Sequence, residues 1–327
     1  MRRLLRQCLV AAVVCALSLT GFSFVYNLAT QGAVPPPAGL TYVQTGDLRT
    51  RYVEWGAAGT PILLLHGFVE SADSWAPTAR LLARDHRVYA IDLDGFGYTQ
   101  RVAPYDTAHL TSQVLDFISA LGLRRPVLVG HSSGAGVAAA VALAAPSEIG
   151  GVMFLDGDGL PLSGTADGGR DDGGFALPIP QPYRTTLLRL VLRSDDAIRM
   201  IYASTCGPRC PVLNEAGVEQ WRRPFQVAGA EPAAFAVLRS GIPALPVAQL
   251  EGLARLPLPK AVVYGADDPE YAPDSAAQTA ARIGAPAPTL IPGARHLTMI
   301  SDPGAVADAI EALAARAAAA APAVNAG

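Results

Sequence analysis

The stretch VLVGHSSGAGVAAA, residues 127–140, decides the fold of this chain. It opens with three apolar residues, passes through a Gly-x-Ser-x-Gly sequence at 130–134, and continues as small residues suited to a helix. In a sharp turn from a buried strand into a helix, a serine hydroxyl is exposed at the edge of a sheet. Glycines on both sides let neighbouring backbone approach closely, and the helix N-terminus favours developing negative charge. The pattern predicts that Ser132 can act as a nucleophile; the alternative is a glycine-rich turn with a serine N-cap.

Buried strands and helices alternate on both sides of this stretch. Short apolar runs separated by helical spacing are typical of parallel strands covered by helices on both faces. The sequence therefore predicts an α/β fold with a mostly parallel, doubly wound sheet. The expected strands are 42–44, 49–55, 62–65, 88–91, 127–129, 152–155, 261–264 and 288–291, and the expected helices are 75–83, 107–121, 132–144 and 303–317.

The alternation stops in one region. Residues 157–258 show helical segments with many prolines and glycines but no convincing buried strand, which predicts a helical cap inserted into a core of 41–156 and 259–317. Ligands of open α/β sheets bind beyond the carboxyl ends of the strands, so a cap there should set substrate choice. The glycine- and aspartate-rich stretch 164–174 is expected to be a mobile entrance loop, and the alanine-rich tail 318–327 is expected to fray.

The cap offers apolar side chains at helix-like spacing. We expect most of them to form the core of the cap and only some to face a pocket, which should then favour a modest, largely apolar group of a ligand. The candidates are Leu187, Leu190, Ile198, Ile201, Trp221, Phe225 and Phe235.

The N-terminus differs from the rest of the chain. Arg2, Arg3 and Arg6 precede a mostly apolar stretch of 22 residues, 8–29, which is long enough to span a bilayer. Arginines before a span stay cytoplasmic, which places the remainder outside the cytoplasm. We favour an uncleaved transmembrane anchor over a cleaved signal peptide, after which the protein would be secreted, because no Ala-x-Ala cleavage site stands out. The prolines of 30–40 indicate a stiff linker.

Composition excludes several classes of protein. Half of the residues are hydrophobic and 16% are charged, so the chain is not disordered. A net charge of −3 argues against nucleic acid as a partner. No metal-ligand cluster or phosphate-binding loop is present in the sequence, so we expect no cofactor. Abundant Ala, Gly and Pro with a single lysine are typical of bacterial coding rich in G and C.

Five short motifs together carry a resemblance to a known family. Besides 130–134 they are HGF at 66–68, DLDGFGY at 92–98, GADDP at 265–269 and GARH at 293–296. With them the chain, over about 42–317, resembles the α/β-hydrolase fold superfamily, of the single-chain type with a helical cap. Asp94 departs from the proline that many relatives carry before Gly-x-Gly. The resemblance implies a catalytic triad in the order serine, acid, histidine.

His296 is the expected base among five histidines. It lies in a late loop behind Pro292 and Gly293 and matches the base of the family. His131 adjoins the serine, but neighbouring side chains point apart at a tight turn. The others are a structural histidine in the loop after the third strand, His66, and two at expected surface helix ends, His86 and His109.

The acid must orient the imidazole of His296 and stabilise its charged form. Asp268 follows the strand 261–264 and matches the family spacing. Asp267 is its neighbour and stays open as an alternative. Asp156 and Asp158 also stay open, because some relatives place the acid after the preceding strand. The resemblance further implies an oxyanion hole made by the backbone N–H groups of Phe68 and Ser133.

Serine at the nucleophile position narrows the chemistry. Haloalkane dehalogenases and epoxide hydrolases of the superfamily use aspartate there. Ser132 instead implies acyl transfer to water, with a small-molecule carboxylic ester as substrate. Thioester, lactone or carbon–carbon bond hydrolysis are alternatives, and so is a ligand-binding receptor of the same fold with little turnover.

Cys206 and Cys210 are expected to form a disulfide. They flank the turn-forming residues 207–209, and an extracytoplasmic cap would lie in an oxidising compartment. Two reduced thiols are the alternative. Metal binding is disfavoured because no further ligands lie nearby in the sequence.

Overall fold

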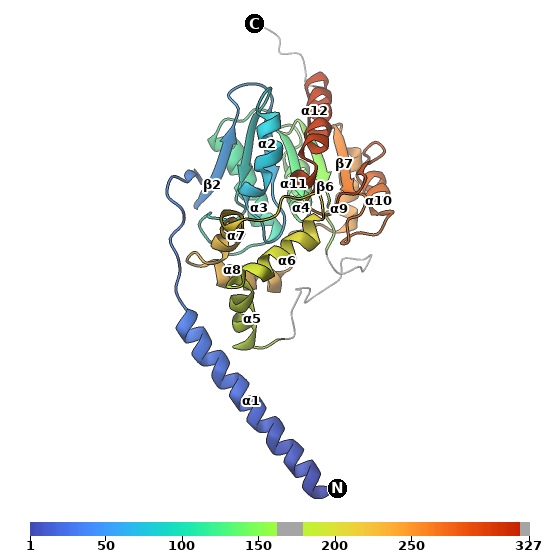
Figure 1. The fold of residues 1–327 in the computed structure, drawn as a ribbon. Coiled ribbons are helices and arrows are strands. Elements are labelled where there is room, and N and C mark those ends of the chain that lie inside the picture. Colours follow the sequence, from blue (N-terminus) through green and yellow to red (C-terminus); the bar gives the residue numbers. More distant parts are fainter. Residues whose placement is uncertain (162–178, 321–327) are drawn as a thin grey trace.

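A computed structural model describes residues 1–161 and 179–320 of the chain. The expected entrance loop at 164–174 and the end of the tail from 321 lie outside the described residues. Figure 1 shows an α/β body, with helices at its lower side and a long N-terminal helix extending from it.

One eight-stranded sheet forms the centre of the body. Its order is β1-β2-β4-β3-β5-β6-β7-β8; β1 pairs antiparallel with β2 and β2 with β4, and all other pairs are parallel. The predicted fold class is therefore confirmed. The strands are β1 (Thr41–Thr45), β2 (Leu48–Trp55), β3 (Pro61–Leu65), β4 (Arg87–Ile91), β5 (Val127–His131), β6 (Gly151–Leu155), β7 (Lys260–Gly265) and β8 (Thr289–Ile291).

Helices cover both faces of the sheet because successive strand residues point to opposite sides. Leu63 and Leu65 pack in a cluster with residues of α3, α4 and α10, whereas Ile62 and Leu64 pack in another with residues of α2 and α12. All four strand residues are fully buried. The helices of the body are α2 (Ala76–Leu82), α3 (Thr107–Ala120), α4 (Gly134–Ala144), α10 (Ser275–Ile283), α11 (Thr298–Ser301) and α12 (Pro303–Ala319), with a 3-10 turn η1 (Ala72–Trp75) before α2.

The elements differ from the sequence prediction at the turn after β5. The strand runs on to His131, and α4 begins at Gly134 rather than at residue 132. Ser132 has a positive φ of 50°, which a helix cannot contain. The backbone therefore turns sharply at Ser132, as the prediction of a nucleophilic serine at this position requires.

The described part of 157–258 contains helices and contributes no strand to the sheet. Most of its helices lie below the body in Figure 1, on the side from which the N-terminal helix extends, and only the last of them lies beside α10. They are α5 (Tyr183–Leu192), α6 (Asp195–Cys206), α7 (Glu215–Arg222), α8 (Ala230–Ser240) and α9 (Val247–Leu250), with 3-10 turns η2 (Arg223–Phe225) and η3 (Glu251–Arg255).

A disulfide joins Cys206, the last residue of α6, to Cys210, with Cα atoms 5.9 Å apart. Cys8 and Cys15 are free and exposed on the N-terminal helix.

The bridge gives a thiol count that can be measured. The full chain, denatured without reductant, should show two reactive thiols, those of Cys8 and Cys15. The same sample should show four after reduction. Four thiols before reduction would contradict the bridge.

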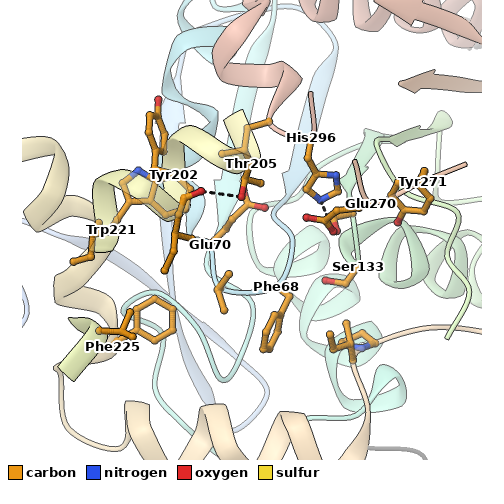
Figure 2. Close-up of a pocket in the computed structure, with 18 of the residues that line it drawn as sticks. Phe68, Glu70, Ser133, Tyr202, Thr205, Trp221, Phe225, Glu270, Tyr271 and His296 are labelled. Atoms are coloured by element: carbon orange, nitrogen blue, oxygen red, sulfur yellow. Dashed lines mark hydrogen bonds and ion pairs between the residues drawn. The ribbon is translucent and has the colours of Figure 1, made fainter. Parts of the chain in front are cut away.

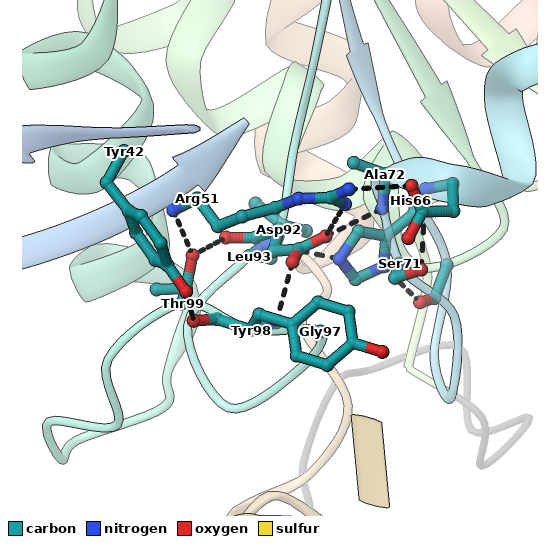
Figure 3. A network of polar contacts seen from close by, with 12 residues as sticks. Tyr42, Arg51, His66, Ser71, Ala72, Asp92, Leu93, Gly97, Tyr98 and Thr99 are labelled. Atoms are coloured by element: carbon teal, nitrogen blue, oxygen red, sulfur yellow. Dashed lines mark hydrogen bonds and ion pairs between the residues drawn. The ribbon is translucent and has the colours of Figure 1, made fainter. Parts of the chain in front are cut away.

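A buried carboxylate organises the loops at the end of β4 (Figure 3). Asp92 accepts hydrogen bonds from the backbone N–H groups of Ala72 at 2.7 Å and Tyr98 at 2.6 Å, and from the Arg51 guanidinium at 3.3 Å. Gly97 lies against this carboxylate with φ 52°, and a Cβ there would overlap the Asp92 side chain. The turn therefore requires glycine at this position.

Gly97→Ala should destabilise the fold by at least about 3 kcal/mol, since it adds a steric clash to the cost of left-handed backbone. Gly122→Ala is the matched control. Gly122 has a similar φ of 60° but nothing within 4 Å of an added Cβ, so its cost should stay near 1 kcal/mol. Urea unfolding of both variants measures the difference, and equal costs would show that the Asp92 contact is unimportant.

The N-terminal apolar helix that the sequence predicts is present as α1 (Arg2–Thr30). Its mean hydropathy reaches 2.3 over 18 residues and only 6% of that window is buried. By length and composition the helix can cross a membrane. A signal sequence has the same properties, so the choice between anchor and signal stays a prediction.

Candidate active site

Ser132 lies at the turn between β5 and α4, between the C-terminal end of the strand and the N-terminus of the helix. Its N–H donates to the Leu155 carbonyl at 2.9 Å, and its own carbonyl accepts from Ala135 N at 3.0 Å. The tight turn has no room for larger neighbours, since a Cβ on Gly130 or Gly134 would meet backbone closer than 3 Å. Ser132 lines a cavity with its side chain partly exposed.

His296 and Asp268 are hydrogen-bonded to each other. The distance from His296 Nδ1 to Asp268 Oδ2 is 2.8 Å, and both side chains are buried. Because Nδ1 is held by the carboxylate, Nε2 is the ring nitrogen left to face the cavity that His296 and Ser132 both line.

The other candidate acids do not contact His296. Asp267 is exposed. Asp158 accepts from the Leu160 N–H at 2.9 Å. Asp156 is fully buried, where it accepts from Gly265 N at 2.7 Å and from the Thr298 hydroxyl. Of the four carboxylates, the structure brings only Asp268 to the imidazole.

The two expected oxyanion donors flank the cavity. Phe68 and Ser133 both line it, and neither backbone N–H makes a hydrogen bond within the described residues. Two free N–H groups beside a serine are the arrangement that stabilises an oxyanion.

Of the histidines outside the cavity, His66 and His109 have polar partners, whereas the Nδ1 of His86 is buried with no hydrogen-bond partner within the described residues. His66 is fully buried, its Nδ1 donates to the Gly67 carbonyl at 2.7 Å, and its Nε2 accepts from Leu93 N at 3.0 Å. Burial lowers the pKa of His66, so the ring is neutral. His109 lies 3.0 Å from Asp94, whose burial raises its carboxyl pKa to about 6.

Sequence reasoning missed a buried ion pair beneath the site. His131 Nδ1 lies 2.7 Å from Glu70 Oε1, and His131 Nε2 lies 2.8 Å from the carbonyl oxygen of His296. Both partners are acceptors, so both ring nitrogens must donate and His131 is an imidazolium. Burial lowers the pKa of His131, but Glu70 more than compensates and raises it to about 9. The cation thereby holds the loop that carries His296.

Two further residues near His296 were also missed. The carboxylate of Glu270 lies 3.5 Å from Nε2, and the ring of Tyr271 stacks on the imidazole at 6.0 Å. They follow Asp268 by two and three residues in the chain, so their closeness to the acid in sequence was the available signal. Figure 2 shows them with His296 and Ser133 on one side of the pocket.

The cavity has a volume of about 380 Å³ and is mostly apolar. Cap side chains form its opposite wall (Figure 2). Of the apolar cap candidates, Ile198, Ile201, Trp221 and Phe225 line it. Phe235 is buried without lining the cavity. Leu187 and Leu190 are exposed, so they belong neither to the core of the cap nor to the cavity wall.

The ionisation of His296 gives a pH prediction. Burial lowers the pKa of His296, but the hydrogen bond that His296 donates to Asp268 and the negative charges of Asp268 and Glu270 outweigh that effect and the repulsion from His131, so the pKa lies above its ordinary 6.5. A base acts only when deprotonated, so kcat/KM should fall as pH drops through a midpoint above 6.5. Asp268→Asn should move the midpoint to lower pH, and an unmoved midpoint would assign it to another group.

Comparison with known proteins identifies the family. A model of the alpha/beta hydrolase family matches residues 62–309. The chain belongs to this family.

Individual relatives share the fold or part of the sequence. Epoxide hydrolase 2 of Caenorhabditis elegans is 37% identical over 106 residues, 31% of this chain and 30% of that protein. The dihydrolipoyllysine-residue acetyltransferase component of the acetoin cleaving system of Cupriavidus necator is 33% identical over 113 residues, 34% of this chain and 30% of that protein. These matches therefore span about a third of the curated relatives. Among solved structures, a membrane phospholipase A, a bacterial virulence factor, superposes with a TM-score of 0.66 at 22% identity and covers 97% of this chain and 99% of that one.

Proposed function

We propose that this hydrolase cleaves a carboxylic ester through an acyl-serine intermediate, with Ser132, His296 and Asp268 as the triad. The observation that carries the proposal is the hydrogen bond from His296 Nδ1 to Asp268 at 2.8 Å beside a cavity that Ser132 lines as well. A serine activated by an oriented imidazole is suited to acyl transfer, whereas an alkyl-enzyme ester needs a carboxylate nucleophile.

The reaction proceeds in two halves. Ser132 Oγ attacks the ester carbonyl carbon while His296 Nε2 takes its proton, and the N–H groups of Phe68 and Ser133 stabilise the oxyanion. The bond to the alcohol oxygen breaks as His296 returns the proton to it. Water then attacks the acyl-serine while His296 takes its proton, and the bond to Ser132 Oγ breaks as His296 returns that proton to the serine, which releases the acid. Asp268 stabilises the imidazolium in both halves.

The apolar cavity under the cap favours an ester with an apolar acyl or alcohol group. No nucleic acid and no cofactor take part in this scheme. We further propose that an uncleaved α1 anchors the protein in a bacterial membrane with the catalytic domain outside the cytoplasm; cleavage of α1 would make it a secreted enzyme.

A chain-length series of p-nitrophenyl esters, C2 to C16, tests this function in detergent-solubilised full chain. Turnover that varies with chain length is the expected result. Saturable ester binding without turnover would instead favour the receptor alternative. Thioester and lactone substrates, assayed in parallel, would identify those activities if they exceeded the best ester.

A further inference from the structure

The C-terminal half of α1 is hydrogen-bonded to the cap helix α5. Asn27 makes three of the contacts: its Nδ2 donates to the Pro182 carbonyl at 3.0 Å, its Oδ1 accepts from the Thr186 hydroxyl at 3.1 Å, and its carbonyl accepts from the Arg189 guanidinium at 2.6 Å. Thr20 is hydrogen-bonded to the Tyr183 hydroxyl. A helix that only tethered the enzyme would need none of these contacts, because the linker after it would suffice.

The helix that α1 contacts is also a wall of the candidate active site. Leu188, Val191 and Leu192 of α5 line the catalytic cavity. A second cavity of about 320 Å³ lies between the end of α1, α5 and α8, and it shares Leu192 and Phe225 with the first. The space beside the N-terminal helix therefore adjoins the catalytic cavity at these two side chains.

The contacts fix the depth of α5 relative to a membrane. About 20 helical residues cross the hydrocarbon core, so a span that starts after Arg6 reaches roughly residue 26. Thr20 then lies about 9 Å inside the outer boundary at 1.5 Å per residue, and Tyr183 lies beside it. Arg193, near Thr30, lies toward water. Tyrosine toward the lipid and arginine toward water is the order typical of a membrane interface.

Exposed apolar side chains gather on the same side of the protein. Leu187 and Leu190 on α5 are 46% and 44% exposed, and Met200 and Ile201 on α6 are 67% and 50% exposed. Ile201 and Val69, which is also exposed, line the catalytic cavity as well. Apolar side chains of the cavity wall therefore reach the protein surface, where water does not favour them. Figure 1 shows α5 and α6 on the side of the body from which α1 extends.

We propose that α1 holds the cap against the lipid surface, so that the catalytic cavity takes its substrate from the bilayer: the acyl ester of a membrane lipid. The chemistry rests on the proposed function above, whereas the docking rests on the α1–α5 contacts and on the exposed apolar side chains of α5 and α6. The residues after α1 carry more acidic than basic side chains, so the attachment depends on apolar area rather than on headgroup charge.

The position of α5 can be measured in the full chain, reconstituted in neutral phosphatidylcholine vesicles with Cys8 and Cys15 replaced by alanine. A fluorophore on Leu190→Cys should be quenched by lipids that carry a doxyl group high in the acyl chain. A fluorophore on Ala315→Cys is the control, because Ala315 is exposed on α12 at the opposite end of the molecule. Equal quenching at the two positions would overturn the docking.

The substrate is tested in the same vesicles by release of fatty acid from phosphatidylcholine. Asn27→Leu, which removes two side-chain hydrogen bonds, should slow this release by up to about tenfold and leave p-nitrophenyl acetate hydrolysis unchanged. Leu28→Ala, at an exposed position of α1 next to Asn27, should change neither rate. Hydrolysis of p-nitrophenyl acetate without fatty acid release would overturn the lipid substrate, and an unaffected Asn27→Leu variant would overturn the role of α1. Failure of p-nitrophenyl acetate hydrolysis in the unmodified chain would reject the proposed function instead.

Discussion

Ser132→Ala should lower kcat/KM for a p-nitrophenyl ester by roughly 10⁶-fold, the order of loss measured when the nucleophile of a serine protease triad is removed. The hydroxyl is the only group lost. Alanine meets the same positive φ as serine, and no hydrogen bond of the Ser132 side chain within the described residues is broken. Thermal unfolding should therefore be nearly unchanged.

Ser133→Ala is the matched control for this variant. Its side chain lines the same cavity, but the proposed role belongs to its backbone N–H, which alanine retains. Activity should stay within a few-fold of the unmodified enzyme. If Ser132→Ala retained more than about a tenth of the activity, Ser132 would not be the nucleophile.

Asp268→Asn should lower kcat by about 10⁴-fold, as the equivalent change does in a serine protease. The amide cannot stabilise an imidazolium, and its NH₂ group can hold His296 in the wrong tautomer. Burial of the Asp268 side chain means that no water replaces the lost charge.

Asp267→Asn separates the two neighbouring carboxylates. Asp267 is exposed and does not contact His296, so this variant should keep nearly full activity. Asp156→Asn should have a smaller effect than Asp268→Asn, since burial already raises the carboxyl pKa of Asp156 to about 7. A larger loss from Asp156→Asn would move the acid to the end of β6.

The centre of the sheet could be predicted because strands β3 to β7 are short, mostly apolar and almost entirely buried. All eight expected strands are present, and their observed ends differ from the predicted ends by no more than two residues. The turn at Ser132 was also recognisable, since glycine on both sides indicates a close backbone approach. The start of α4 was misplaced because residue type alone does not show a positive φ at a serine.

The pairing of His296 with Asp268 followed from the resemblance to the family, which the matched family model confirms for 62–309. Choosing Asp268 over Asp267 needed coordinates, because adjacent aspartates differ only in the direction of their side chains. The Glu70–His131 pair was not foreseen. Its members are 61 residues apart, and no local pattern relates an acid in one loop to a histidine at the end of another strand.

The contacts of α1 illustrate a further limit of prediction from sequence. Hydropathy identified a helix able to cross a membrane, but it treats Thr20 and Asn27 only as interruptions of an apolar run. Their role depends on the partner helix α5, which lies about 160 residues away in the chain. Polar residues within an apolar helix become informative only when the surface they meet is known.

The most direct test of the proposed function is the site of covalent labelling. The full chain would be treated with a fluorophosphonate, digested and analysed by mass spectrometry. The account predicts one phosphonyl adduct, on the peptide that contains Ser132, and its loss in Ser132→Ala and His296→Ala. Ester hydrolysis together with an adduct on another residue, or with none, would contradict an acyl-serine mechanism at Ser132.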